Sequence, residues 1–269
     1  MKTRILVAAA GLPVLLVVLL ALPSIATSIA IALLCAIAAW ELLWKTGILH
    51  SKRLVALGVV LAAGAAMWSC FGFHALAFRI GLYVLMVLII AELLHDKSIG
   101  FESAACLFVA ALVIPVMFSA IARLRAMELG RFYVLLPFVV TFSGDSGAYF
   151  VGRAWGKHKL APITSPKKTV EGAVGGVVCA MVVMVIYGLV VTFAFQKTFA
   201  WIPAMICALV GALMAIFGDL AFSHIKRQHK IKDYSNLLPG HGGVLDRFDS
   251  TIFVAPLVEL VILLFPLVR

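Results

Sequence analysis

Long runs of apolar residues without a charged side chain dominate this sequence. Many of them approach about 20 residues, the length that a helix needs to cross the hydrocarbon core of a bilayer. Backbone N–H and C=O groups cannot be left unbonded in hydrocarbon, so only helices or closed barrels cross it. The runs are continuous rather than alternating, which favours helices over barrel strands. The composition agrees, since 64% of the residues are hydrophobic and 13% are charged.

These runs predict an all-α, polytopic integral membrane protein with about nine transmembrane helices. No internal repeat or interdomain linker is evident, so we expect a single membrane domain over residues 1–269. Within it, we expect the helices of residues 1–131 to form a scaffold and residues 132–269 to carry the active site. The expected helices cover residues 5–22, 24–44, 54–73, 76–94, 102–122, 132–151, 173–195, 200–222 and 251–268.

The distribution of Lys and Arg predicts the orientation of these helices, because cytoplasmic loops of membrane proteins carry an excess of both. With nine spans and the N-terminus inside, most of the 22 Lys and Arg residues lie on the cytoplasmic side. The cluster from Arg123 to Arg131 is the exception. We therefore expect a multi-pass protein of the cell's inner (cytoplasmic) membrane whose active site faces the cytoplasm.

Charge and cysteine content argue against several classes of protein. The net charge of +10 is explained by topology and by contact with anionic lipid, so we expect no nucleic-acid partner. The five cysteines lie in or beside apolar runs and form no C-x-x-C pair, so we expect small buried hydrophobes rather than disulfides or a zinc site. The charge-free run of residues 5–22 is longer than the apolar core of an ordinary secretory signal, and we expect it to be a retained helix.

Two polar segments interrupt the apolar pattern, at residues 152–171 and 223–250. Both are basic and rich in Gly and Pro, and we expect both to be loops. In the nine-helix arrangement they lie on the same, cytoplasmic side of the membrane. The polar chemistry of the chain is therefore expected there.

Four aspartates are expected at the cytoplasmic ends of helices. Asp145 and Asp219 lie near the ends of the sixth and eighth spans, and Asp246 and Asp249 open the ninth. A carboxylate in or near hydrocarbon is costly and usually functional. Asp246 and Asp249 are three residues apart, so one face of a helix presents both. Converging oxygen ligands suit a hard cation such as Mg²⁺, which we favour over helix caps and ion pairs.

Three glutamates, Glu41, Glu92 and Glu259, also lie in or near spans. Glu259 is the deepest of them in its span. For Glu259 we expect a hydrogen bond between helices, and a functional role stays open.

Basic side chains surround the level of the aspartates. Cations beside a metal-binding acid cluster suit a nucleoside triphosphate or a phospholipid headgroup, because they neutralise phosphate oxygens and stabilise charge during transfer. Topology explains some of these cations but not their interleaving with Gly, His and Asp. They are Lys157, Lys159, Lys167, Lys168, Lys226, Arg227, Lys230, Lys232 and Arg247.

The glycines of the two segments have different expected roles. Residues 240–243, with the sequence GHGG, can bring backbone N–H groups close to an anion or form a plain turn. Gly172 and Gly176 are spaced for close packing of helices, and we expect packing there. Residues 152–158 superficially resemble a P-loop, but they are one residue short and lack the Ser or Thr after Lys.

The second segment and its surroundings resemble a known enzyme family. Residues 223–249 read S-x-x-K-R-x(4)-K-D-x(3)-L-L-P-G-H-G-G-x-L-D-R-F-D, and the earlier runs GDSGAYFVGR and SPKKTVEG accompany them. These motifs resemble those of the phosphatidate cytidylyltransferases, also called CDP-diacylglycerol synthases. The resemblance covers about the C-terminal half of the chain, and the N-terminal half matches only as generic apolar helices.

The resemblance implies an enzyme with a defined reaction and cofactor. CTP and phosphatidic acid would give CDP-diacylglycerol and pyrophosphate, with Mg²⁺ required and a second cation left open. The lipid phosphate is already ionised at neutral pH, so alignment and charge neutralisation suffice without a strong base. The expected partners are CTP, phosphatidic acid and the bilayer, and a homodimer is left open.

On this resemblance we expect three groups of site residues. The expected metal ligands are Asp219, Asp246 and Asp249, with Ser223 as an added ligand. The expected catalytic residues are Asp145, Lys167, Lys168, Lys226, Arg227 and Arg247. The expected substrate-binding residues are Lys157, Ser165, Glu171, Lys232, Asp233, His241, Gly242 and Gly243.

Three alternatives remain beside this interpretation. A CTP-dependent polyprenol or phytol kinase would use similar substrates but would release CDP rather than pyrophosphate. A CDP-alcohol phosphotransferase is disfavoured because its D-G-x-x-A-R pattern is absent. An ion-coupled transporter would also carry intramembrane acids, but transporters place them near the midplane of the bilayer, whereas here they gather at one face.

Overall fold

The structure, a computed structural model, describes residue 9, residues 11–70 and 100–268, and all of residues 80–91 except 82 and 85. Glu92 lies outside the described residues, as does part of the predicted span 76–94. The chain divides into two compact units, and the predicted division into scaffold and active site at residue 131 stays a prediction. The first unit comprises the described residues of Met1–Val18, Leu22–Ala122 and Asp233–Asp246, and the second those of Leu19–Ala21, Arg123–Lys232 and Arg247–Arg269.

Six helices in the described part of the chain are long and apolar enough to cross a membrane. They correspond one by one to six of the predicted spans, so the predicted all-α, multi-pass fold is confirmed, whereas the count of nine is not. The predicted first span is represented by a shorter apolar helix, Gly11–Ala21, and the last by α12 (Leu245–Leu264). The six are Ser24–Lys45, Lys52–Cys70, Phe101–Ala126, Gly130–Trp155, Val170–Phe195 and Trp201–Gln228.

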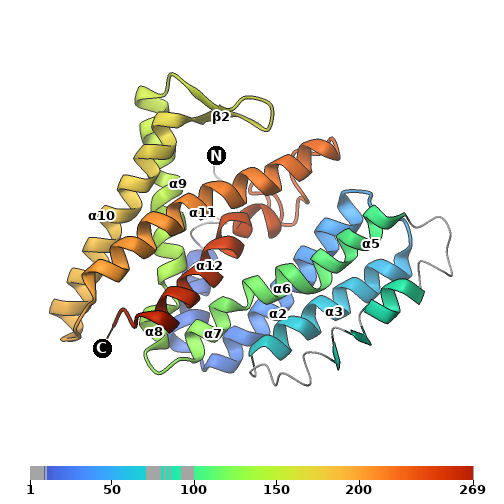
Figure 1. The fold of residues 1–269 in the computed structure, drawn as a ribbon, viewed down its shortest axis with the longest axis horizontal. Coiled ribbons are helices and arrows are strands. Elements are labelled where there is room, and N and C mark those ends of the chain that lie inside the picture. Colours follow the sequence, from blue (N-terminus) through green and yellow to red (C-terminus); the bar gives the residue numbers. More distant parts are fainter. Residues whose placement is uncertain are drawn as a thin grey trace. The chain divides into compact units, whose positions relative to one another are not determined.

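The first unit is built mainly on two helices, α2 and α3, that pack side by side (Figure 1). A π-helical turn, η2, extends α2, and the following helical segments pack against α3. Gly58 of α3 lets a helical segment approach closely, because a Cβ there would come within 2.8 Å of the Leu107 side chain of α5. The bounds are η1 Val17–Ala21, shared between the units, and α2 Ser24–Trp40, η2 Glu41–Lys45, α3 Lys52–Cys70, α5 Phe101–Phe108, η3 Val109–Val113 and α6 Ile114–Phe118.

The second unit is a group of long helices joined by short connections and one hairpin. Helix α9 packs along α10, and α10 and α9 both contact α11. Its core is apolar and includes the buried side chains of Val140, Met184, Val254 and Val258. The bounds are α7 Ala120–Ala126, whose last residues belong here, α8 Gly130–Tyr133, α9 Leu136–Trp155, β1 Lys159–Ala161, β2 Ser165–Thr169, α10 Val170–Phe195, α11 Trp201–Gln228 and the greater part of α12.

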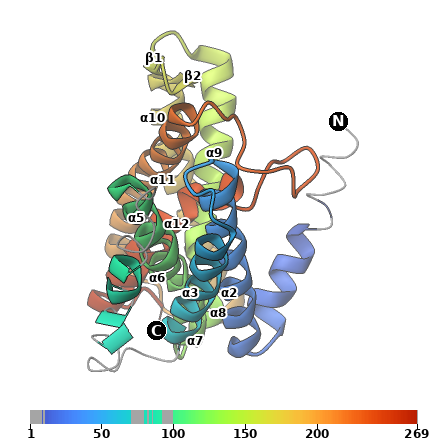
Figure 2. The same ribbon diagram turned by 90° about the vertical axis from the view of Figure 1, so that its right-hand side faces the viewer.

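A β-hairpin joins α9 to α10, where the sequence had predicted a loop. Strands β1 and β2 pair antiparallel, with Lys159 opposite Thr169 and Ala161 opposite Ser165. Figures 1 and 2 show the hairpin extending beyond the adjoining ends of the two helices. Pro166 is compatible with β2 because each strand of a two-stranded sheet is an edge strand, where a missing N–H is tolerated.

Several helices are longer than their apolar runs, which corrects the predicted loop boundaries. Helix α11 continues to Gln228, and α12 begins at Leu245, so both ends of the predicted loop 223–250 are helical. The predicted spans end where the apolar runs end, at residue 222 for α11. Basic residues in the last turn, such as Lys226 and Arg227 of α11, instead favour continuation, because they complement the negative end of the helix dipole.

Glycine allows α9 and α10 to approach closely, as the spacing of Gly172 and Gly176 predicted. A Cβ on Gly176 would lie 2.7 Å from the carbonyl oxygen of Gly144, and one on Gly172 would lie 2.8 Å from that of Ala148. Both separations are below those of real Cβ contacts. The packing role predicted for this glycine pair is therefore confirmed.

Glu259 forms a hydrogen bond between helices, as the sequence predicted. Arg123 donates from Nε to one oxygen of Glu259 and from Nη2 to the other, each over 2.6 Å. This bidentate pair links α7 to α12 within the second unit. It gives Arg123, which stood out as an exception to the charge bias, a structural role.

Replacing Gly176 with Ile should destabilise the protein, because the new side chain would overlap the α9 backbone. Overpacking of this kind costs about 1–3 kcal/mol. Thermal unfolding of the purified protein in detergent measures the effect. Gly64→Ile is the matched control, since no atom lies within 4 Å of a Cβ built on Gly64. Equal unfolding temperatures for the two variants would contradict the packing argument.

Candidate functional site

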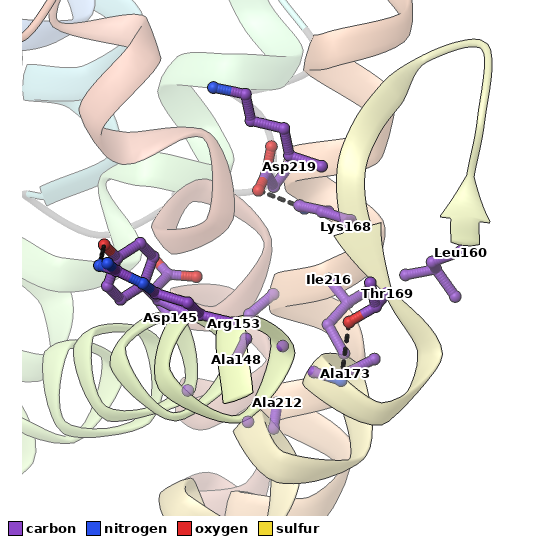
Figure 3. Close-up of a pocket in the computed structure, with 17 residues that line it drawn as sticks. Asp145, Ala148, Arg153, Leu160, Lys168, Thr169, Ala173, Ala212, Ile216 and Asp219 are labelled. Carbon is purple, nitrogen blue, oxygen red and sulfur yellow. Dashed lines mark hydrogen bonds and ion pairs between the residues drawn. The ribbon is translucent and has the colours of Figure 1, made fainter. Parts of the chain in front are cut away.

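A cavity of about 420 Å³ lies in the second unit among α9, the hairpin, α10 and α11 (Figure 3). This volume is typical of sites for small molecules. One side of the cavity is charged and the other is formed by small residues. Its lining includes Asp145, Lys167, Lys168 and Asp219, four residues that the sequence predicted for the site.

The charged side is organised by an ion pair between β2 and α11. Lys168 Nζ pairs with Asp219 Oδ2, and in Figure 3 the two side chains point toward each other. The hydroxyl of Ser223, one turn further along α11, donates to Asp219 Oδ1 over 3.1 Å. Both side chains of the ion pair are about one-quarter exposed, at 27% and 26%. The pair is therefore within reach of a ligand that enters the cavity.

Two further aspartates lie close to Asp219. The carboxylates of Asp145 and Asp249 each experience electrostatic repulsion from Asp219, and Asp249 also from Asp145. Lys168 and Arg247 offset this repulsion at Asp145, and Lys226 offsets it at Asp249. The second unit thus brings three of the four predicted aspartates together with three of the predicted cations.

The hairpin places its lysines by means of a helix cap. Thr169, the last residue of β2, is the N-cap of α10, and its hydroxyl oxygen accepts the N–H of Gly172 over 3.1 Å. The cap satisfies one of the donors left free at the start of a helix. Because Lys167 and Lys168 directly precede this residue, the cap fixes where the strand carrying them begins to turn into α10.

The remaining side of the cavity consists of small or apolar residues. Glycine and alanine residues of α9, α10 and α11 line the cavity there, together with Leu160 of β1 and Ile216 of α11. Figure 3 shows the alanines Ala148, Ala173 and Ala212 on this side. A surface with charge on one side and apolar atoms on the other suits an amphiphilic ligand.

Other predicted residues of the hairpin region hold the fold locally. Glu171 accepts the backbone N–H groups of Lys157 and His158 and contacts His158 Nδ1 over 2.5 Å. Arg227 donates to the carbonyl oxygens of Thr164, over 3.4 Å, and Ile231, over 3.2 Å. These contacts fasten both ends of the hairpin. The substrate-binding or catalytic roles predicted for Lys157, Ser165, Glu171, Arg227 and Lys232 stay predictions.

The second half of the family-like motif lies in the first unit, as a loop that ends at Asp246. Oδ2 of Asp246 accepts the N–H of Tyr234 over 2.8 Å and that of Gly243 over 2.9 Å. Gly242 has φ +88°, and a Cβ there would lie 2.8 Å from the same oxygen. The loop therefore closes around Asp246. The roles predicted for Asp233, His241, Gly242, Gly243 and Asp246 stay predictions.

Tyr149 and Arg153 also line the cavity, although neither was among the predicted site residues. The tyrosine hydroxyl accepts a hydrogen bond from Arg153 Nη1 over 3.0 Å. With Asp145 they are spaced at i, i+4 and i+8, which places all three on one face of α9. Two signals in the sequence could have indicated them: the four-residue spacing that begins at Asp145, and the position of both residues in the family-like run GDSGAYFVGR.

The oxygen atoms around Asp219 suit a divalent cation chemically. Asp219, Asp249 and Ser223 offer the hard ligands that Mg²⁺ prefers. Over the described ranges, no group of three or more His, Cys, Asp or Glu residues is arranged as a metal site. The cation that neutralises Asp219 here is Lys168.

Comparisons with known proteins place this arrangement in a family. The model of the cytidylyltransferase family matches residues 2–265. The chain belongs to the cytidylyltransferase family. Among curated members, the phosphatidate cytidylyltransferase of Bacillus subtilis is 38% identical over 188 residues, which are 70% of this chain and 68% of that protein. The predicted family and enzyme class are confirmed.

Staphylococcal members of the cytidylyltransferase family are also similar. The phosphatidate cytidylyltransferase of Staphylococcus saprophyticus is 44% identical over 134 residues, and that of Staphylococcus haemolyticus is 42% identical over 134 residues. Each alignment spans 50% of this chain and 50% of the relative. The aligned part of the chain thus spans about half the length of these two proteins.

Loss of the α10 cap should destabilise the protein and disturb the cavity of this cytidylyltransferase. Thr169→Val keeps the shape of the side chain but removes the acceptor, and loss of an N-cap costs about 1 kcal/mol. Thermal unfolding in detergent measures the change, and Thr169→Ser, which keeps the acceptor, is the control. The prediction fails if the valine and serine variants unfold at the same temperature.

Proposed function

We propose that this chain transfers the cytidylyl group of CTP to phosphatidate, giving CDP-diacylglycerol and pyrophosphate. The observation that carries the proposal is the Lys168–Asp219 pair at the edge of a half-charged, half-apolar cavity, in a chain of the cytidylyltransferase family. Phosphatidate cytidylyltransferase is also the name of the relatives from Bacillus and Staphylococcus.

The reaction requires one substitution at phosphorus. An oxygen of the phosphatidate headgroup forms a bond to the α-phosphorus of CTP, and the bond from that phosphorus to the bridging oxygen breaks, releasing pyrophosphate. The attacking oxygen is already ionised at neutral pH, so no residue has to remove a proton from it. The catalytic task is to align two anionic substrates and offset their charge.

Lysines of the hairpin provide the cations for that task. Lys167 and Lys168 line the cavity from β2 and would contact phosphate oxygens. When a phosphate group arrives, Lys168 can exchange Asp219 for it, because a lysine side chain is a flexible point charge with three donors. Arg153, held by Tyr149, supplies a further cation on α9.

We propose Asp219, Asp249 and Ser223 of the second unit as ligands of Mg²⁺, with Asp145 beside them. The ligand role of Asp246, which belongs to the first unit, stays a prediction. When bound, the ion would offset charge on the phosphate oxygens. Release of Asp219 by Lys168 would free the carboxylate for this role. Lys226 and Arg247, which interact electrostatically with this acid cluster, would limit the repulsion among its members.

The cavity matches an amphiphilic substrate at a membrane boundary. Its charged side suits the triphosphate of CTP and the phosphate headgroup of phosphatidate. Its alanine and glycine side suits the glycerol and the first carbons of the acyl chains. The helices that form it are membrane-spanning candidates, so the acyl chains can stay in lipid during the reaction. We place the protein in the inner membrane of a bacterium, with this cavity facing the cytoplasm and CTP.

The product of the reaction distinguishes this function from its alternatives. Purified protein incubated with CTP, phosphatidate and Mg²⁺ should give a lipid that carries label from the cytidine moiety, together with pyrophosphate. Extraction of the lipid and separate detection of pyrophosphate and CDP are the measurements. Omission of phosphatidate is the control. A parallel incubation replaces phosphatidate with a polyprenol or phytol, and release of CDP with a phosphorylated alcohol there would identify a kinase. Cation flux in liposomes without turnover of CTP would identify a transporter.

Asp219→Asn should lower turnover by at least about 100-fold, because the variant loses the charge on which Lys168 and the proposed cation depend. The rate of CDP-diacylglycerol formation at saturating substrates measures it. Glu128→Gln makes the same chemical change at an exposed position outside the cavity and should leave the rate unchanged. A folded Asp219→Asn protein with near-normal turnover would refute the assignment.

A further inference from the structure

Glu41, at the junction of α2 and η2, is a fully buried acidic residue that the reaction described above does not use. Its side chain has 0% exposure. Burying a carboxyl group costs several kcal/mol unless donors or a cation compensate it. Among the described residues, no basic side chain forms a salt bridge with Glu41. The compensation must come from neutral donors.

Those donors belong to the loop that precedes α12 and to the first residue of that helix. The Ser235 hydroxyl donates to Glu41 Oε1 over 2.6 Å, and the Val244 N–H donates to the same oxygen over 2.9 Å. The Leu245 N–H donates to Oε2 over 2.7 Å. Glu41 therefore holds residues 235–245 by hydrogen bonds at both the start and the end of this stretch. All of these residues lie within the first unit.

The closeness of the Glu41 carboxyl group explains why position 243 is a glycine. A Cβ built on Gly243 would lie 2.6 Å from both Cδ and Oε2 of Glu41. No other residue type could occupy the position without displacing the carboxyl group. The N–H of Gly243 meanwhile donates to Asp246. The loop is thus closed between two carboxyl groups, one from a distant helix and one from its own end.

The backbone around Glu41 also departs from regular helix. The π-helical turn η2 begins at this residue, and π-helical turns are frequent at functional sites because they redirect side chains. Leu245, which donates to Glu41, is the first residue of α12. Asp246 directly follows Leu245 in the same unit, so the position at which α12 begins also affects where Asp246 lies.

We propose that Glu41 is a positioning residue for the cytidylyl-transfer reaction: it anchors residues 235–245 and thereby sets the orientation of Asp246 and the start of α12. It contacts no substrate and is not itself catalytic. The proposal rests on the proposed function in so far as it concerns turnover. The anchoring of the loop stands on geometry alone.

Hydrogen–deuterium exchange of the full-length protein tests the anchoring without any activity. Glu41→Gln replaces one of the two acceptor oxygens by a donor. Amides of residues 234–245 should then exchange at least about tenfold faster, since one hydrogen bond to a charged group contributes a factor of about 10 to 100. Glu259→Gln is the matched control, because it makes the same change at a mostly buried carboxylate of the second unit. It should leave exchange in this loop unchanged.

Kinetics test the consequence for the reaction. Glu41→Gln should lower kcat by about 10- to 100-fold and raise the Mg²⁺ concentration needed for half-maximal activity, while KM for CTP changes less. Ser235→Ala removes one donor and keeps the carboxyl group, so it should show the same pattern to a smaller extent. It also serves if the glutamine variant does not fold.

Two results would overturn the proposal. One is unchanged exchange of residues 234–245 in Glu41→Gln and Ser235→Ala. The other is a loss of turnover no larger than that of Glu259→Gln, compared at equal folded fractions and with the same Mg²⁺ dependence as wild type. If wild-type protein forms no CDP-diacylglycerol, the proposed function fails, and the exchange measurement still decides whether Glu41 anchors the loop.

Discussion

A carboxyl group inside a membrane protein must be compensated by a donor or a cation, and the kind of partner differs among the acids of this protein. Glu259 accepts hydrogen bonds from Nε and Nη2 of Arg123, and Glu41 from backbone N–H groups and a hydroxyl. Those partners are fixed by the fold. Asp219 pairs with Lys168, whose flexible side chain can exchange one anion for another. An exchangeable pair of this kind is what a phosphate-binding site requires.

The second constraint is that other atoms must come very close to the backbone. Glycine makes this possible in two places, with a different result in each. At the α9–α10 contact, Gly172 and Gly176 let helix backbones touch, which brings the hairpin lysines to the side of the cavity. In the loop before α12, Gly243 gives room to the Glu41 carboxyl group. One of the two predictions for the segment GHGG was that its glycines bring the backbone close to an anion. In the structure, Gly242 and Gly243 lie close to carboxyl groups of the protein itself, those of Asp246 and Glu41.

The fold was predictable where hydrophobicity decides it and less so where local hydrogen bonding does. Apolar runs identified six spans, since the bilayer imposes a minimum length that few other structures share. The hairpin was missed because its strands are short, basic and interrupted by Pro166, so neither alternation nor apolar content marks them. The ends of α11 and α12 were misplaced because charged residues that complement the helix dipole, basic at the end of α11 and acidic at the start of α12, extend both helices past their apolar stretches.

The candidate site shows the same division between local and distant information. Asp145, Lys168 and Asp219 were found because a family-like motif or a charge in an apolar run marks each of them individually. The contacts of Glu41 join residues 194 to 204 positions apart in the chain, and nothing near Glu41 in the sequence indicates where its donors lie. A buried acid without a nearby basic residue still had to have donors somewhere. Tertiary structure supplies them from the segment in which the sequence predicted substrate-binding residues, so part of that segment is held in place by a side chain of the protein itself.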